Sequence, residues 1–195
     1  MNIIIAGVGG QGIILASRAL AEAALEAGLA VRTAETIGMA QREGAVVSHV
    51  RIGLPDYGPL IPRATADILL AFEPGEAARH LACLRKGGSA VVATSPVMPV
   101  SVSLGASAYD VDAVLRFLEG AVEHPYFLDA AALAREAGSI KALNMVMLGA
   151  LSRLDLPVGE QNLLEAALKL LPPQTETVNR RAFALGRQAL EGLEK

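Results

Sequence analysis

The hydrophobic pattern along the chain alternates between buried-strand runs and amphipathic helices. Residues 2–6 form a short apolar run that stops at glycines, as a strand buried on both faces does. From about residue 11 to 27 the apolar positions recur with a helical period, and charged residues occupy the opposite face. Gly28 then ends the helix, and a second strand is expected at about residues 29–34. This opening predicts a strand–helix–strand unit.

The remainder of the chain continues the same alternation. Residues 35–45 have no periodicity and contain two glycines, which predicts a loop of about ten residues. Further strands are expected at 46–52, 66–72, 87–95 and 125–130. Helices are expected from Pro74 onward, at about 110–121 and over "AALAREAG" (131–138).

From Lys141 the chain is helical in pattern, in three pieces separated at "LDLPVG" and "LPPQT". We find no internal repeat and no convincing linker. The sequence therefore predicts one α/β domain over residues 1–195, with a Rossmann-like, mostly parallel sheet flanked by helices and a helical extension over about residues 140–195.

Composition narrows the classes of partner. The 195 residues carry a net charge of −3 and no run of Lys or Arg, which argues against nucleic acid. No apolar run reaches the ~18 residues needed to cross a bilayer, so a soluble protein without a membrane partner is expected. The single cysteine, Cys83, excludes an internal disulfide and a metal cluster held by several thiolates of this chain. A reducing, cytoplasmic location fits this composition.

A glycine motif follows the first strand. Gly7, Gly9 and Gly12 match G-x-G-x-x-G, directly after a strand and at the start of a helix, which is the setting of a dinucleotide site. Glu35, about 20 residues further on, stands where an acid would hold the ribose of NAD. The same glycines would equally permit a tight turn and close helix–strand packing without a ligand. From these residues alone both interpretations stay open.

Several candidate groups fall at one edge of the expected sheet. Ligands of open α/β sheets bind beyond the carboxyl ends of the strands. Thr94 and Ser95 end a strand at that edge, and the glycine segment follows another strand there. We expect a crevice or interface there, and its candidate residues are Gly7, Gly9, Gly10, Gln11, Gly12, Met39, Gln41, Arg42 and Glu73.

Other polar residues have simpler interpretations. His49 and Arg51 share a strand face that we expect to be solvated, and Glu73 is expected to cap the helix that starts at Pro74. Asn144 lies in an apolar helix, so an internal hydrogen bond is favoured over one across a subunit interface. We interpret Cys83 as a small apolar packing residue rather than a nucleophile. Met39, Met145 and Met147 are interpreted as packing residues.

Two long segments together resemble a known family. "GVGGQGIILASRALAEAA" and "GMAQREGAVVSHVRIG" are similar to the gamma subunit, or gamma domain, of the 2-oxoacid:ferredoxin oxidoreductases, and most closely to the beta subunit of the indolepyruvate type. "ADILLAFEPGEAARHL", "ALNMVMLGAL" and "NRRAFALGRQAL" resemble later segments of that family. The resemblance runs from Met1 to about Leu190.

The resemblance implies a function. Such complexes oxidatively decarboxylate 2-oxoacids with thiamine diphosphate, magnesium, iron–sulfur clusters and CoA, and they reduce ferredoxin. In the indolepyruvate type, arylpyruvates give aryl-acetyl-CoA. The gamma part has a Rossmann-like fold without a nicotinamide and holds no cofactor, so this chain would be inactive alone. A large subunit would carry the thiamine site and the clusters and would pass electrons to ferredoxin.

The sequence leaves three points open. One is whether the chain belongs with a pyruvate or 2-oxoglutarate enzyme, or is a free-standing NAD-binding protein. Another is the stoichiometry, including a homodimer within a hetero-oligomer. The third concerns Arg42, which we expect to face the partner's thiamine site or the CoA path as a fork for carboxylate or phosphate. The alternative is a surface arginine paired with Glu43 or Glu35.

The family loop is also altered in this chain. Where the resemblance implies Gln-Arg-Gly-Gly, the sequence has Gln41, Arg42, Glu43 and Gly44. If the backbone there requires positive φ, Glu43 destabilises it by about 1 kcal/mol or more. The loop is therefore expected to differ from that of the family.

Overall fold

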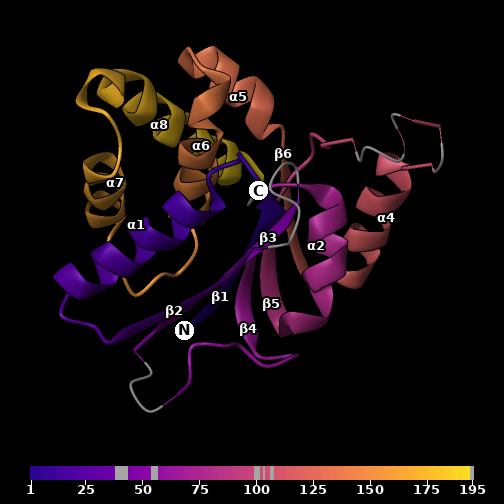
Figure 1. The fold of residues 1–195 in the computed structure, drawn as a ribbon, viewed down its shortest axis with the longest axis horizontal. Helices are drawn as coiled ribbons and strands as arrows, with labels where there is room; N and C mark the ends of the chain where they lie inside the picture. The colour runs from indigo at the N-terminus through magenta and orange to yellow at the C-terminus, as the bar shows by residue number, and fades with distance from the viewer. Residues whose placement is uncertain (38–43, 54–56, 99–101, 103, 106–107, 194–195) are drawn as a thin grey trace.

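A six-stranded sheet forms the centre of the molecule (Figure 1). The computed structural model describes residues 1–37, 44–53, 57–98, 102, 104–105 and 108–193. The strands are β1 (Asn2–Val8), β2 (Val31–Ile37), β3 (Ala45–Ile52), β4 (Ala66–Ala71), β5 (Leu84–Ala93) and β6 (His124–Leu128). The α-helices are α1 (Ile13–Glu26), α2 (Pro74–His80), α4 (Val111–Ala121), α5 (Ala130–Ala137), α6 (Leu143–Leu151), α7 (Glu160–Lys169) and α8 (Glu176–Leu193).

The sheet is mixed, in the order β2-β3-β1-β4-β5-β6. β1, β4, β5 and β6 are mutually parallel neighbours. β3 lies between β1 and β2 and runs antiparallel to both. The α/β fold with a helical C-terminal part is thus confirmed, but the strand that follows α1 is not the neighbour of β1. This order moves the end of β2 one strand further from the glycine turn than in a dinucleotide-binding sheet.

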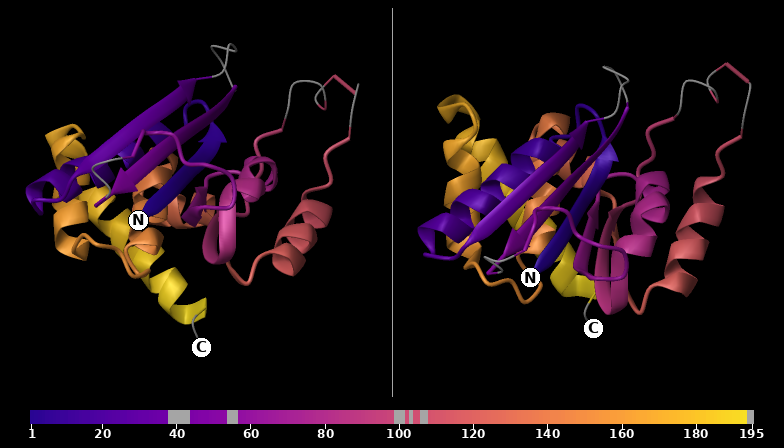
Figure 2. Two further views of the ribbon diagram at one scale, coloured as in Figure 1. Left: turned by 90° about the horizontal axis from the view of Figure 1, so that it is seen from below. Right: turned by 60° about the horizontal axis from the view of Figure 1, so that its bottom comes forward.

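Helices cover the two faces of the sheet unequally. One face, which includes Ile3, Ile5 and Val50, packs against α1, α5, α6 and α8 in the larger hydrophobic core, with α7 packed on α1. The other face, which includes Ile4 and Leu69, packs against α2 and α4 in a smaller core. The two views in Figure 2 show these layers. None of the described helices combines the length and hydropathy that a bilayer crossing requires.

The helices α6 and α8 cross in direct backbone contact. A Cβ on Gly149 of α6 would lie 2.0 Å from the carbonyl oxygen of Phe183, and one on Gly186 of α8 would lie 1.9 Å from that of Val146. Glycine is unfavourable within a helix, by about 1 kcal/mol relative to alanine. Here its lack of a side chain lets the two helices approach, which fixes α6 behind the glycine turn.

Candidate functional site

The glycine turn between β1 and α1 is shaped by packing. A Cβ on Gly7 would lie 2.8 Å from Phe72 Cβ and 3.1 Å from Ile13 Cδ1. Gly12 has a φ of +87°, and a Cβ there would lie 2.7 Å from Asn144 Nδ2. Gly10, with a φ of +95°, faces open space. Close packing and positive φ therefore account for Gly7, Gly10 and Gly12 without a ligand.

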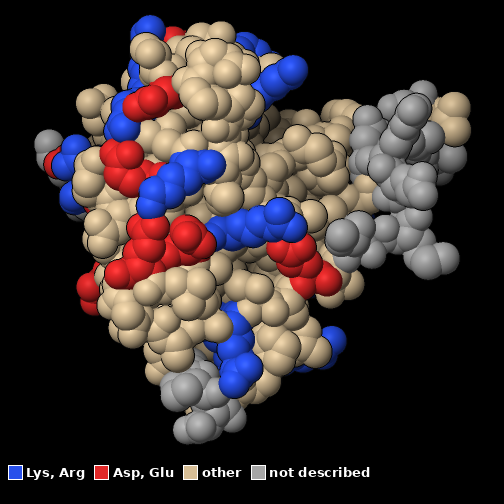
Figure 3. All heavy atoms as spheres, turned by 60° about the vertical axis from the view of Figure 1, so that its left-hand side comes forward, with Lys and Arg blue, Asp and Glu red and all other residues tan. Residues whose placement is uncertain are grey.

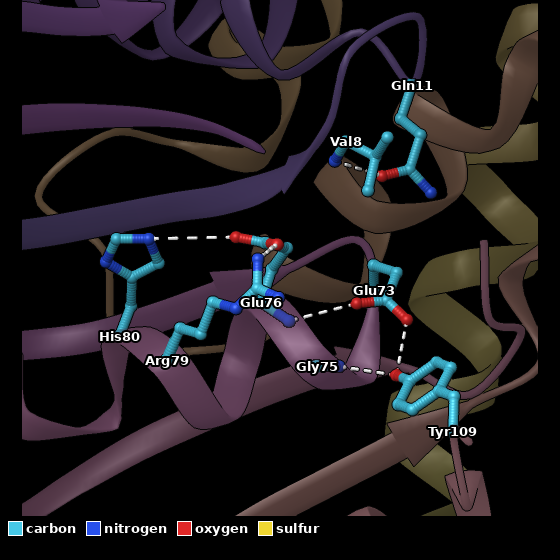
Figure 4. Close-up of polar contacts among 8 residues, drawn as sticks. All are labelled: Val8, Gln11, Glu73, Gly75, Glu76, Arg79, His80 and Tyr109. Atoms are coloured by element: carbon cyan, nitrogen blue, oxygen red, sulfur yellow. Dashed lines mark hydrogen bonds and ion pairs between the residues drawn. The ribbon is translucent and has the colours of Figure 1, made fainter. Parts of the chain in front are cut away.

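Gln11 closes the turn by folding back across two strand ends (Figure 4). Its Oε1 accepts from the backbone N–H of Val8 (2.7 Å), and its Nε2 donates to the carbonyl oxygen of Phe72 (2.9 Å). The N–H of Gly9 donates to Gly44 O (2.9 Å), and that of Gln11 donates to Val8 O (3.2 Å). Three backbone donors that could cradle a pyrophosphate are therefore already bonded within the protein.

Glu35 does not complete a dinucleotide site. It lies on β2, with β3 between it and β1. The Ser17 hydroxyl of α1 donates to its Oε1 (3.2 Å). Because the acid is one strand further away than in an NAD-binding sheet and three donors of the turn are bonded internally, the geometry does not support the NAD interpretation.

A cleft with a volume of about 360 Å³ opens beside the glycine turn. Of the candidate residues, it brings Gly10 and Gln11 together with Ser95 at the carboxyl edge of the sheet. It is completed by Pro96, Val97, Ala131, Arg135, Ile140, Lys141 and Leu143. Thr94 does not line it: the Thr94 N–H donates to Leu128 O (3.0 Å). Glu73 does not line it either.

The rim of this cleft is cationic. Arg135, near the end of α5, and Lys141, just after it, are both exposed, and within the described residues neither takes part in an ion pair. The Ser95 hydroxyl donates to Asp129 Oδ1 (3.0 Å), which also caps α5 by accepting from the N–H of Ala132 (2.9 Å). Sequence reasoning missed both cations, although the segment "AREAGSIK" places them just beyond the last strand.

Glu73 is a structural cap, as predicted. Its Oε2 accepts from the N–H of Glu76 (2.9 Å), and its Oε1 accepts from the Tyr109 hydroxyl (2.5 Å). The Gly75 N–H in turn donates to the Tyr109 oxygen (2.8 Å). Burial and the Glu73 carboxylate raise the pKa of Tyr109. Glu73 Oε2 thus caps α2, and Oε1 fastens Tyr109 to the start of that helix (Figure 4).

A second buried carboxylate lies one turn further along α2. Burial raises the pKa of Glu76, and Arg79, which donates to its Oε1 (2.6 Å), opposes that rise. Its Oε2 lies 3.9 Å from His80 Nε2. Burial, then the charge of Arg79, lowers the pKa of His80, and burial, then the charges of His80 and Arg51, lowers that of His49. At neutral pH both histidines are therefore uncharged.

The solvated-face prediction is wrong for Arg51. Its side chain is buried, with 5% of the residue exposed. It donates to Asn2 Oδ1 (3.0 Å), Gly58 O (2.8 Å) and Leu60 O (3.1 Å), and it stacks 4.8 Å from the Tyr57 ring centre. Burial is tolerated because Nε and Nη1 of the guanidinium donate to three protein acceptors. His49, half-buried beside it, accepts from the Ile61 N–H through Nδ1 (3.1 Å).

Other candidates are placed as follows. Asn144 is buried and its Oδ1 accepts from the Met145 N–H (2.9 Å), an internal hydrogen bond as expected. Met145 and Met147 are fully buried packing residues, also as expected. Met39, Gln41 and Arg42 lie outside the described residues, and so does Glu43, so their roles stay predictions.

The residues of this chain do not fit an iron–sulfur cluster. A four-iron cluster needs several thiolate ligands, and Cys83 is the only cysteine of the sequence. Among the described residues, no three His, Cys, Asp or Glu side chains come close enough together to hold a metal ion.

Known sequences match over nearly the whole chain. The family model described as pyruvate ferredoxin/flavodoxin oxidoreductase matches residues 2–189. Indolepyruvate oxidoreductase subunit IorB of Thermococcus kodakarensis is 43% identical, covering 96% of this chain and 95% of its own length, and that of Pyrococcus horikoshii is 40% identical with the same coverage. 2-Oxoglutarate synthase subunit KorC of Methanothermobacter thermautotrophicus is 32% identical, covering 97% and 94%.

Solved structures share the fold. The keto/oxoacid ferredoxin oxidoreductase gamma subunit of Geobacter sulfurreducens superposes with a TM-score of 0.73 at 25% identity, covering 98% of each chain. The 2-oxoglutarate:ferredoxin oxidoreductase of Magnetococcus marinus superposes with a TM-score of 0.71 at 23% identity, covering 98% of this chain but 31% of that one. In the second case the same fold is one part of a much longer chain.

Proposed function

Because the chain belongs to the pyruvate ferredoxin/flavodoxin oxidoreductase family, we propose that it is the small subunit of an indolepyruvate-type 2-oxoacid:ferredoxin oxidoreductase. The family resemblance expected from the sequence is confirmed. The observation that carries the indolepyruvate assignment is full-length identity of 43% to an indolepyruvate oxidoreductase subunit, against 32% to a 2-oxoglutarate synthase subunit. A gamma subunit of a pyruvate or 2-oxoglutarate enzyme is the alternative.

The proposed reaction is the oxidative decarboxylation of arylpyruvates to aryl-acetyl-CoA with reduction of ferredoxin. A large subunit would hold thiamine diphosphate, magnesium and the iron–sulfur clusters. This proposal agrees with a chain whose only thiol is Cys83 and whose glycine turn is bonded internally. A cytoplasmic location is part of the proposal, since one cysteine and oxygen-sensitive partner chemistry both suit a reducing compartment.

We further propose that the cationic cleft lies on the CoA path. Exposed Arg135 and Lys141 flank a cavity large enough for part of a nucleotide, and guanidinium and ammonium groups bind phosphate. Arg42 remains a candidate for the same path. In the complex, the double variant Arg135→Ala/Lys141→Ala should raise KM for CoA about tenfold or more with little change in kcat. Arg181→Ala, at an exposed position of α8, is the control and should leave KM for CoA unchanged. If the double variant also leaves KM for CoA unchanged, Arg135 and Lys141 do not lie on the CoA path. An unchanged KM for CoA in Arg42→Ala would exclude Arg42 in the same way.

Reconstitution tests the assignment itself. The large subunit is assayed with and without this chain for ferredoxin reduction driven by indolepyruvate, pyruvate or 2-oxoglutarate. We expect turnover to require both chains and CoA and to be fastest with indolepyruvate. Preference for pyruvate or 2-oxoglutarate would favour the alternative subunit, and full activity of the large subunit alone would contradict the proposal.

A further inference from the structure

Two side chains of β3 hold the segment that follows this strand against the sheet. We call residues 57–61 the latch segment. Arg51 donates to two carbonyl oxygens of the latch segment (2.8 and 3.1 Å), and His49 accepts from the Ile61 N–H through Nδ1 (3.1 Å). The side chain of Ile61 is buried in the smaller core. Three hydrogen bonds and one apolar side chain therefore tie the latch segment to this side of the sheet.

The chain just beyond the latch segment is fixed to a different part of the fold. The Ala64 N–H donates to Ala82 O (2.9 Å), and the Thr65 N–H donates to Cys83 O (3.0 Å). Ala64 has a φ of +57°, a left-handed conformation that residues with a side chain rarely adopt. A strained residue beside a fixed end marks a point about which the preceding segment can turn. Release of the latch segment from β3 therefore leaves Ala64 and Thr65 in place.

The hydrogen bond between His49 and the latch segment requires a neutral ring. An imidazole nitrogen accepts a hydrogen bond only when it carries no proton. Because Nδ1 of His49 accepts from the Ile61 N–H, the ring proton is on Nε2. A second proton would make Nδ1 a donor that faces the N–H of Ile61, which is also a donor. Protonation of His49 thus breaks this hydrogen bond.

The surroundings of His49 disfavour its charged form. Charged and titratable side chains approach it from four sides: Arg51 on β3, Arg32 on β2, Tyr57 in the latch segment, and His80 on α2 with Glu76 and Arg79. On β1 the residue opposite His49 is the uncharged Ile4.

No carboxylate within the described residues pairs with His49. The carboxylate of Glu76 pairs with Arg79, and its Oε2 lies 3.9 Å from His80 Nε2 (Figure 4). Burial, then the charges of His80 and Arg51, lowers the pKa of His49. His49 therefore binds a proton more weakly while the latch segment is closed than it would in water.

The paired charges on the other side of the molecule are insensitive to mild acid. In Figure 3 acidic and basic side chains interleave over the face that carries α1, α7 and α8. A hydrogen bond from Arg180 lowers the pKa of Glu165, and one to Glu26 raises the pKa of Lys169. Both shifts favour the charged forms. Histidines ordinarily titrate in mild acid, and the third histidine of the chain, His124, is exposed at the start of β6.

We propose that His49 is a proton-sensitive latch, whose protonation releases residues 57–61 from β3. In the released state His49 is an ordinary solvated histidine, whereas the closed state excludes its second proton. Opening therefore takes up a proton and becomes more favourable as the pH falls below about 6.5, the ordinary pKa of histidine. Release uncovers His49 and the buried Ile61, so the surface on this side of the sheet depends on pH. This inference is independent of the proposed function.

Native-state hydrogen exchange of the full chain measures the opening at one amide. The Phe72 N–H, which donates to Ala6 O (2.8 Å) within the sheet, reports opening of the whole fold. After correction for intrinsic rates, the Ile61 N–H should exchange faster than that of Phe72. Its protection factor should fall about threefold to tenfold from about pH 7.5 to about pH 5.5. Protection of Ile61 that does not change with pH, or that equals that of Phe72 at every pH, would overturn the proposal.

Two substitutions identify the titrating group. In His49→Asn the side-chain oxygen can still accept from the Ile61 N–H but does not titrate, so the protection factor of Ile61 should change less than about twofold over the same interval. His80→Gln removes the neighbouring histidine and keeps the latch, so the loss of protection in acid should persist. An equal loss in His49→Asn and the wild type, or no loss in His80→Gln, would assign the proton to another group and overturn the proposal.

Nitrogen-15 spectroscopy of the histidine rings tests the proposal without mutation. At about pH 7.5 we expect the proton of the His49 ring on Nε2, with Nδ1 unprotonated, because Nδ1 accepts from the Ile61 N–H. A proton on Nδ1 at that pH would mean that the hydrogen bond to the latch segment does not form, and the proposal would be wrong.

Discussion

Replacing Gly186 with alanine tests the packing account at its tightest point. The new Cβ would lie 1.9 Å from Val146 O and 2.7 Å from the carbonyl carbon, whereas real Cβ atoms essentially never come within 3.0 Å of such a neighbour. Both neighbouring atoms are backbone, so no side chain can turn aside. The helices α6 and α8 must therefore separate by about 1 Å, which breaks the close packing of that layer.

The magnitude is the balance of two effects. Alanine in place of glycine favours a helix by about 1 kcal/mol. Forcing extra volume into a packed core destabilises by typically about 1–3 kcal/mol, and by more where backbone must move. We expect a net loss of about 2 kcal/mol or more in the free energy of unfolding. For a chain of this size this lowers Tm by roughly 4–8 °C.

The assay is urea and thermal unfolding of the isolated chain, with a control in the same helix. A Cβ on Gly192 would meet no atom within 4 Å, so Gly192→Ala should leave stability unchanged or raise it. Gly149→Ala, which meets Phe183 O at 2.0 Å, should behave like Gly186→Ala. If Gly186→Ala unfolds within about 0.5 kcal/mol of the wild type, the backbone contact is not what holds α6 against α8.

Three further predictions concern other named contacts. Arg51→Met should lower the free energy of unfolding by about 3 kcal/mol, because it leaves a buried amide oxygen and two carbonyl oxygens without their donor. Arg63→Met, at an exposed position, is the control and should change the free energy of unfolding little. Equal urea midpoints for the two variants would contradict this prediction. Gln11→Ala should lower the free energy of unfolding by about 1–2 kcal/mol, because it removes two hydrogen bonds of the glycine turn. Calorimetry should detect no binding of NAD to the wild type or to this variant. Tight NAD binding by the wild type would refute the structural interpretation of the turn. The third prediction concerns pH dependence. The fold lowers the pKa of His49 below the ordinary histidine value of 6.5, so at a pH between these two pKa values the unfolded state binds more protons than the folded state. Stability is therefore lost as the pH falls from about 6.5 toward the pKa of the folded state. Unfolding curves from about pH 7 to 5 should show a smaller loss in His49→Asn than in the wild type, and an equal loss in both would contradict the assignment.

Local patterns in the sequence predict most elements but not their order in the sheet. Apolar runs and helical periods locate the strands and helices because each depends on the residues' own alternation. The position of β3 between β1 and β2 depends on pairing between distant segments, which alternation does not encode. The predicted strand–helix–strand opening is therefore correct in its elements, while Glu35 is one strand away from where a nucleotide would need it.

The candidate site shows the same division. Glu73 was predictable as a cap because its partner is three residues away in sequence. The burial of Arg51 was not, because its acceptors come from Asn2 and from the loop after β3. Arg135 and Lys141 join the cleft only through the packing of α5 beside the glycine turn. Gly149 and Gly186 were visible as glycines inside helices, but the backbones they approach were not.

The most direct test of the central claim is affinity purification of the tagged chain from its native cell under anaerobic conditions. The purified material is assayed for iron, thiamine diphosphate and arylpyruvate-dependent ferredoxin reduction. The account predicts a large iron–sulfur subunit at a fixed ratio, with that activity. A chain that purifies alone and binds NAD would contradict it, and the glycine turn would then have to be a nucleotide site.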